Sequence, residues 1–114
     1  MSKSTDFTVQ IVASEHVSWT IEHQQQVVAF SAQEFRSIKD CYMHLVSLSK
    51  LISEKKIDIS TRTTNSSKKF LTSINLTGSR TAEAFIVPHV SYHEAEMVAV
   101  KCLRAIAAAG KQKT

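Results

Sequence analysis

The chain has little glycine and proline: two glycines and one proline occur among its 114 residues. Nucleotide-binding loops need several glycines at close spacing, because their backbone amides must approach the phosphates without side chains in the way. The two glycines of this chain lie far apart and leave no glycine-rich loop. The sequence therefore disfavours dinucleotide-binding and P-loop chemistry.

Cysteine is equally scarce. Cys41 and Cys102 lie far apart, and neither belongs to a Cys-x-x-Cys pair. A disulfide framework or a thiolate zinc site would need more cysteines at closer spacing. We expect both residues to be buried as small apolar side chains, without a mutual bridge and without zinc.

Long apolar runs are also lacking. No stretch approaches the roughly 20 apolar residues that span a bilayer, and the opening MSKSTDFTVQ has no apolar segment typical of a secretory signal. We therefore expect an intracellular, cytoplasmic protein without membrane contact. A composition of 43% hydrophobic and 21% charged residues is typical of a globular chain. The length suits one domain, 1–114, with one core.

The first half predicts three strands and a helix. Apolar and polar residues alternate in FTVQIVA (7–13) and VSWTIE (17–22), as in strands with one buried face. A third strand, QVVAFS (26–31), runs into a helix whose predicted capping box is Ser31 with Glu34. The helix should end near Lys55 and Lys56. Its predicted buried stripe recurs at helical spacing and consists of Phe35, Ile38, Tyr42, Leu45, Leu48 and Ile52.

The second half repeats this plan. KIDIST (56–61), FLTSINL (70–76) and TAEAFIVP (81–88) predict strands, and Ser91 with Glu94 predicts a second capping box. The helix behind it is the more apolar one and should end at Gly110 in a left-handed cap position. The predicted fold class is α+β: a single domain of two βββα halves (1–55 and 56–110), with an antiparallel sheet packed by two helices and a flexible basic tail, 111–114. Internal duplication and coincidence both remain open, because the halves share little sequence identity.

The net charge of +4 is spread unevenly. Residues 1–49 carry three basic and five acidic groups (3 − 5 = −2), whereas residues 50–80 carry seven basic and two acidic groups (7 − 2 = +5). The stretch STRTTNSSKKF (60–70) adds many hydroxyls to this basic strand-turn-strand region, 56–80. Such a surface suits contact with phosphates. The alternative is a solvated connection and an edge strand protected from aggregation by its lysines.

Base stacking would require exposed aromatic side chains near this charge. Trp19 shares a strand face with Val17 and Ile21, so we expect it in the core. Phe70 borders the lysine pair and is the better candidate for stacking. The predicted nucleic-acid-binding residues are Lys56, Arg62, Lys68, Lys69, Phe70 and Arg80.

The segment VVAFSAQEFRSIKD (27–40) resembles the strand-to-helix junction of PUR repeats and, more loosely, of Whirly proteins. This resemblance implies repeated sheet-plus-helix units that bind single-stranded nucleic acid. The first three strands depart from that pattern, because their polar face carries no lysine or arginine. It carries Thr8, Gln10, Ser18, Thr20 and Glu22. Binding would then belong to the second half or be lost.

Catalytic and metal-binding patterns are weak. His89 and His93 have a suitable spacing for a metal, but Ser91 starts a helix between them, so the two histidines do not share one helix face. Cys41 and His44 lack the strained turn and oxyanion-binding loop that a nucleophile needs. The ten acidic residues form no cluster resembling a two-metal site. We expect no catalytic residues, no metal and no cofactor, and hence no enzyme.

Two functions fit these observations. The first is a small non-enzymatic nucleic-acid-binding protein that contacts the phosphates of single-stranded DNA or RNA through residues 56–80. The alternative is a protein-protein interaction module, such as an inhibitor or subunit from a phage or other mobile element, which docks on a partner or forms a homodimer. Charge segregation favours the first.

Overall fold

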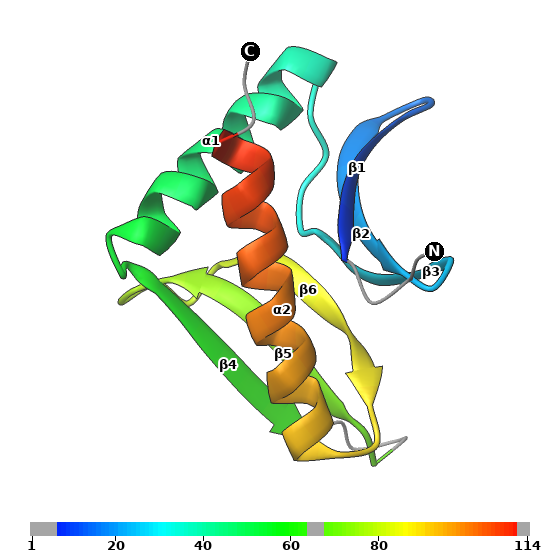
Figure 1. The fold of residues 1–114 in the computed structure, drawn as a ribbon, viewed down its shortest axis with the longest axis vertical. Helices are drawn as coiled ribbons and strands as arrows, with labels where there is room; N and C mark the ends of the chain where they lie inside the picture. Colours follow the sequence, from blue (N-terminus) through cyan, green and yellow to red (C-terminus); the bar gives the residue numbers. More distant parts are fainter. Residues whose placement is uncertain (1–6, 64–67, 112–114) are drawn as a thin grey trace.

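Three strands followed by one helix occur twice along the chain (Figure 1). The computed structural model describes residues 7–63 and 68–111. The elements are β1 (Thr8–Ala13), β2 (Val17–His23), β3 (Gln26–Ser31), α1 (Ile38–Ser53), β4 (Ile57–Thr63), β5 (Phe70–Leu76), β6 (Ala82–His89) and α2 (Tyr92–Lys111). This arrangement confirms the predicted α+β fold of two βββα halves in one domain. The predicted tail lies outside the described residues except for Lys111, which ends α2.

All six strands form one antiparallel sheet in the order β1-β2-β3-β6-β5-β4. The last strand of each half therefore lies at the centre, where Ala29 pairs with Ile86, Phe30 with Phe85 and Ser31 with Ala84. Adding 55 to the residue numbers 29–31 of β3 gives residues 84–86 of β6 (84 − 29 = 55). Exchanging the two strands in this way gives the same three pairs again. The central ladder thus has a local two-fold axis at the Phe30–Phe85 pair.

Both helices pack on the same face of this sheet and on each other (Figure 1). Alternate strand residues point into the core between sheet and helices, as period-two patterning requires. The largest fully buried side chains are those of Trp19, Ile21, Leu45, Ile74, Ile86, Ile106, Thr72, Cys41 and Cys102. The opposite face of the sheet is called the open face below.

The start of α1 differs from the prediction. Ser37 is its N-cap, and the Ser37 hydroxyl accepts a hydrogen bond from the amide of Asp40 at 3.1 Å. Ser31 is instead a buried residue at the end of β3, whose hydroxyl donates to the Gln33 carbonyl at 2.9 Å. The helix cannot start earlier because Phe35 is held against β2: its amide donates to the Val17 carbonyl at 2.7 Å. The serine half of the second predicted capping box is confirmed at the start of α2, where the Glu94 amide donates to the Ser91 hydroxyl at 3.3 Å. The Glu94 carboxylate lies 3.5 Å from His89 Nδ1.

The later start also changes the buried stripe of α1. Leu45 and Leu48 are buried as predicted, but Ile38 is 56% exposed because it opens the first turn. Cys41 and Ser49 complete the buried stripe at spacings of three to four residues.

The sequence predicted that Gly110 caps α2, and this prediction is wrong. Gly110 lies inside the helix, which continues to Lys111. A side chain at this position would overlap the Ser49 Cβ and come within 2.9 Å of the Leu45 carbonyl oxygen. The glycine therefore allows the two helices to approach closely. The Ser49 hydroxyl fixes the same crossing by donating to the Ala107 carbonyl at 2.9 Å.

Two further predictions concern burial and membranes. Cys41 and Cys102 are both buried and unbridged on the helices. Within residues 7–63 and 68–111, neither helix combines the length and the apolar character that membrane crossing demands.

Candidate nucleic-acid interface

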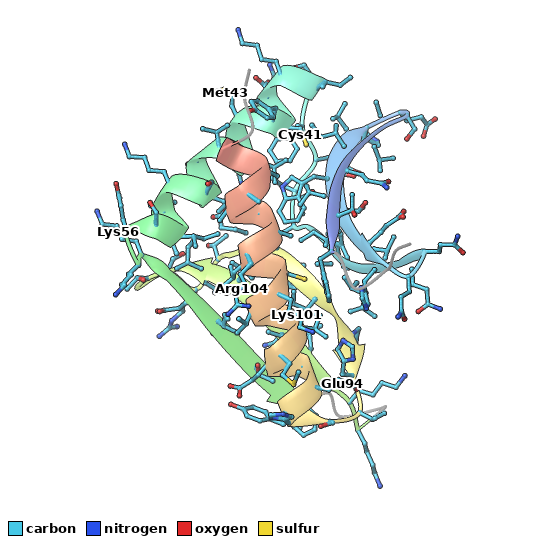
Figure 2. All side chains as sticks on the ribbon, in the orientation of Figure 1. Cys41, Met43, Lys56, Glu94, Lys101 and Arg104 are labelled. Atoms are coloured by element: carbon cyan, nitrogen blue, oxygen red, sulfur yellow. The ribbon has the colours of Figure 1, made fainter. Side chains whose placement is uncertain are left out.

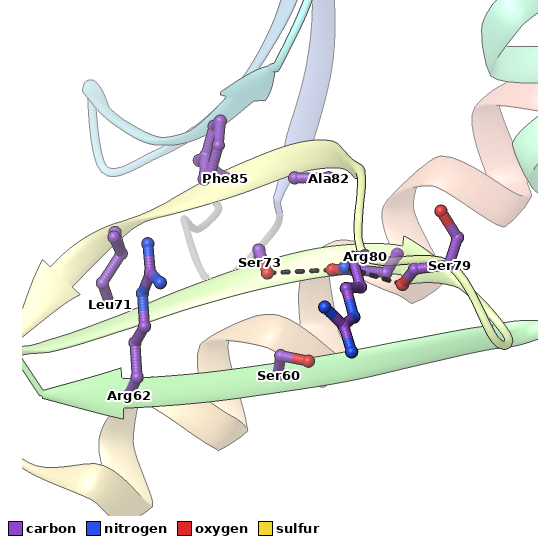
Figure 3. Close-up of a pocket in the computed structure, with 9 residues that line it drawn as sticks. Ser60, Arg62, Leu71, Ser73, Ser79, Arg80, Ala82 and Phe85 are labelled. Carbon is purple, nitrogen blue, oxygen red and sulfur yellow. Dashed lines mark hydrogen bonds between the residues drawn. The ribbon is translucent and has the colours of Figure 1, made fainter.

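A hollow of about 390 Å³ lies on the open face over β4, β5 and β6 (Figure 3). The face is identified by β5, where Ser73 lines the hollow while its neighbours Thr72 and Ile74 are buried toward the helices. The residues that line it are Ser60, Arg62, Leu71, Ser73, Asn75, Ser79, Arg80, Ala82 and Phe85.

Two arginines from different elements meet at this hollow (Figure 3). Arg62 extends from β4 toward β5 near Leu71, and Arg80 extends from the turn between β5 and β6 toward Ser60, so the two guanidinium groups line the hollow at different places. None of the described lining residues is acidic, although Asp58 lies on the same face of β4, two residues before Ser60. Guanidinium groups beside hydroxyls and an amide are the donors that phosphate oxygens accept.

The turn that carries Arg80 is held by its own hydrogen bonds. Gly78 has a φ of +85°, a left-handed conformation that favours glycine. The Asn75 amide donates to the Ser79 carbonyl at 3.3 Å, and the Asn75 carbonyl oxygen accepts from the Ser73 hydroxyl at 2.8 Å. The backbone of Arg80 is therefore fixed, while its exposed side chain keeps the freedom to follow a ligand.

An aromatic pair continues from the hollow toward the centre of the sheet. Phe85 lines the hollow, and Phe30 lies beside it on β3 with ring centroids 6.0 Å apart and planes tilted by 41°. Phe30 is 40% exposed, which is unusual for a large ring at the middle of a sheet. The open face therefore combines two cations with two accessible aromatic rings.

The predicted binding residues do not all gather here. Arg62 and Arg80 share the hollow, whereas Lys68 and Lys69 are exposed in the hairpin just before β5 and are not among its described lining residues. Lys56 lies at the other end of β4, at the junction with α1 (Figure 2), and its Nζ is 3.6 Å from Glu54 Oε1. Six residues of strand separate it from Arg62, which is about 20 Å. Residues 64–67 of the basic stretch lie outside the described residues.

Phe70, the predicted stacking residue, is half-buried on the helix side of β5. Its ring meets Tyr92 of α2 edge-on, with centroids 5.7 Å apart, while the next residue, Leu71, lines the hollow. Phe70 and the arginines are therefore on opposite faces of the sheet. Trp19 is fully buried, as expected.

Phe30 and Phe85 were missed in the sequence, although a signal for them exists. Both follow an alanine at the same place in each half, in VVAFS and AEAFI. Ala29 and Ala84 are fully buried beneath the helices, so alternation puts the phenylalanines on the open face. Which of the two faces remains open depends on helix packing and cannot be read from one strand.

The described residues also bear on metal-binding and thiol chemistry. Among the described residues, no group of three or more His, Cys, Asp and Glu side chains could hold a metal ion. Burial raises the pKa of Cys41 to about 11, which keeps the thiol protonated and weakly nucleophilic at neutral pH. His44 Nδ1 accepts a hydrogen bond from Trp19 Nε1 at 3.0 Å, and His44 Nε2 lies 2.9 Å from Glu83 Oε1. Both ring nitrogens are therefore used in contacts that stabilise the fold.

The fold and site together define an α+β domain with an open antiparallel sheet and a basic hollow on its uncovered face. Comparisons with protein-family models, curated proteins and solved structures find no match. The function must therefore be argued from the geometry of the site.

Proposed function

We propose that this protein binds nucleic acid through phosphate contacts on the open face of its sheet. The observation that carries the proposal is the meeting of Arg62 and Arg80 over one hollow lined by serines and an asparagine. Arginine holds phosphate oxygens through two parallel N–H groups, which gives direction as well as charge. The hydroxyls of Ser60 and Ser79 can supply the uncharged donors that usually complete a phosphate site, whereas the Ser73 hydroxyl donates to Asn75.

The remaining basic residues support this site to different degrees. Lys68 and Lys69 lie in the hairpin whose last described strand pair is Thr63–Phe70, close to the Arg62 end of β4. They add positive potential near the hollow without lining it. Lys56 is paired with Glu54 at the far end of β4, so we expect it to contribute least.

The proposal predicts a steep dependence of affinity on salt. Each phosphate contact made by a cation contributes about 0.7 to the logarithmic salt slope for single strands. The double variant Arg62→Ala/Arg80→Ala should therefore lower the slope by about 1.4 and weaken binding at least tenfold for all sequences alike. Labelled DNA and RNA oligonucleotides titrated across a salt series would measure both quantities.

A matched control removes two cations from the helix side of the molecule. Lys101 and Arg104 are exposed on α2 (Figure 2), so Lys101→Ala/Arg104→Ala changes the net charge equally and should leave the slope near that of the parent. A parent protein that binds no oligonucleotide at about 50 mM salt would refute the proposal, since phosphate contacts are strongest there. So would a folded Arg62/Arg80 variant with unchanged slope.

A further inference from the structure

We infer that Phe30 and Phe85 form a platform on which unpaired bases stack, so that the open face takes a single strand in preference to a duplex. This inference rests on the proposed function and identifies the form of its ligand. Its basis is the position of two accessible rings directly beside the arginine-lined hollow. The base-paired stack of a duplex covers the base faces that such rings would contact.

The exposure of the pair is not required by packing. The core side of β3 and β6 at this level is filled by Ala29 and Ala84, both fully buried, while the larger rings lie on the uncovered side. An aromatic pair on a sheet surface stabilises the cross-strand ladder. That role explains their contact with each other but not the 40% exposure of Phe30. Large accessible apolar groups beside a charged rim mark binding surfaces.

The geometry fits one nucleotide bridging both features. Strand β6 carries Phe85 and is two strands away from β4, which carries Arg62, a separation of about 10 Å. The Arg62 side chain extends from β4 toward β5 and shortens this gap (Figure 3). A phosphate at the arginines therefore leaves its base over Phe85, and the next base over Phe30.

The charges on the open face determine over which β-strands the bound nucleic acid can lie. Beyond Phe30, the open face of β2 carries Glu22, whose carboxylate accepts a hydrogen bond from Gln10 of β1 at 3.4 Å. No described residue of β1 or β2 is a lysine or arginine. Phosphates are therefore favoured over β4–β6 and disfavoured over β1 and β2, which makes a short footprint centred on the aromatic pair.

The test separates stacking from charge. Phe30→Ala and Phe85→Ala should each weaken single-strand binding by about 5- to 150-fold, the usual loss when a stacked base loses its aromatic partner. The salt slope should stay at the parent value, because no counterion release is involved. Phe30→Leu should lose most of the affinity despite its apolar bulk, whereas Phe30→Trp should keep it. A blunt-ended duplex of matching sequence should bind all four variants like the parent, and more weakly than the single strand.

Fluorescence gives a direct readout. In Phe30→Trp the new indole should be quenched by a single-stranded oligonucleotide, while the buried Trp19 of the parent should not respond. Val12→Ala removes another exposed apolar side chain on the open face, at β1, and should leave binding unchanged. Folding of each variant is checked by its circular dichroism and by the Trp19 emission.

The two proposals fail in different ways. If Phe30→Ala and Phe85→Ala bind like the parent while Arg62→Ala/Arg80→Ala loses salt slope, the platform is overturned and phosphate binding stands. If the parent binds no nucleic acid, both are overturned. A parent that is dimeric by light scattering, and that becomes monomeric in the phenylalanine variants without any change in oligonucleotide affinity, would assign the pair to self-association and also overturn the platform.

Discussion

At the level of single residues, the half-buried His44 joins the two halves of the protein. The Trp19 indole can only donate, so His44 Nδ1 must accept its hydrogen bond, and the ring proton then sits on Nε2. That proton is directed at Glu83 Oε1, 2.9 Å away. The three residues come from β2, α1 and β6, and their hydrogen bonds are complementary in direction. His44 is therefore hydrogen-bonded through both ring nitrogens, and the Trp19 indole depends on His44 for its partner.

Replacing His44 should destabilise the fold through its partners. His44→Ala would leave a buried indole N–H and a carboxylate that is 23% exposed without their partner, and we expect a loss of about 2–4 kcal/mol in unfolding free energy. His44→Gln can both accept and donate and should lose less. Urea denaturation followed through Trp19, the single tryptophan, measures both. Equal losses for the two variants would show that packing against Phe35, and not hydrogen bonding, matters there.

At the level of elements, the closest helix contact depends on the absence of a side chain. Gly110→Ala should favour the helical state by about 1 kcal/mol in isolation. Overlap with Ser49 and the Leu45 carbonyl opposes it, so we expect a net loss of about 1–3 kcal/mol. Ser49→Gly itself removes the hydrogen bond to Ala107, but in that background Gly110→Ala should cost less, because one of the two clashing groups is absent. Chemical denaturation of the single and double variants measures this coupling.

Gly78→Ala provides a contrasting control for this prediction. Gly78 has open space around its Cβ position but a φ of +85°, so the cost there is backbone strain of about 1–2 kcal/mol. It has no link to Ser49, and its loss should be the same with or without Ser49→Gly. A Gly110→Ala protein more stable than the parent would mean that the helices separate at little cost.

The elements also show how far local patterns predict this fold. Strand alternation and the Ser91 cap were sufficient for the βββα order and for the start of α2, because these signals are local. Ser31 and Glu34 satisfy the same capping pattern, yet Phe35 is held to β2 by a contact between distant residues. The function of Gly110 likewise depends on a second helix. Local signals fail where tertiary contacts decide the backbone.

The candidate site was likewise predictable from the sequence only in its local features. Its basic region could be read from composition, but the meeting of Arg62 with Arg80 depends on β5 lying between β4 and β6. The assignment of Phe70 to stacking depended on which face it occupies, and the tyrosine of α2 places it on the helix side. Strand order and face are properties of the whole sheet, so neither could be obtained from the sequence of one strand.

The whole molecule is symmetric in fold and asymmetric in charge. Ile21 pairs with Ala29 as Ile74 pairs with Ala84, so the Val12–Ser18 pair of the first hairpin lies at the place of the Arg62–Leu71 pair of the second. The two hairpins end at the same level, at Ala13–Val17 and at Thr63–Phe70, and the second carries Arg62 where the first carries Val12. The first hairpin, residues 8–23, has no lysine or arginine. The two hairpins therefore share their strand pairing and differ in the positive charge that the second one carries.

This asymmetry predicts different kinetic effects for the two groups of cations. Lys68 and Lys69 are exposed outside the described lining of the hollow, so they should act on an approaching polyanion through the long-range field. Lys68→Ala/Lys69→Ala should therefore slow association severalfold at low salt and change dissociation little. Arg62→Ala/Arg80→Ala should chiefly speed dissociation, because it removes contacts made in the complex. Stopped-flow mixing with a labelled oligonucleotide at two salt concentrations resolves both rates. At about 0.15 M salt the Debye length falls to about 8 Å, and the association rates of the parent and the lysine variant should converge. If instead the lysine variant dissociates faster at both concentrations, Lys68 and Lys69 belong to the contact surface itself.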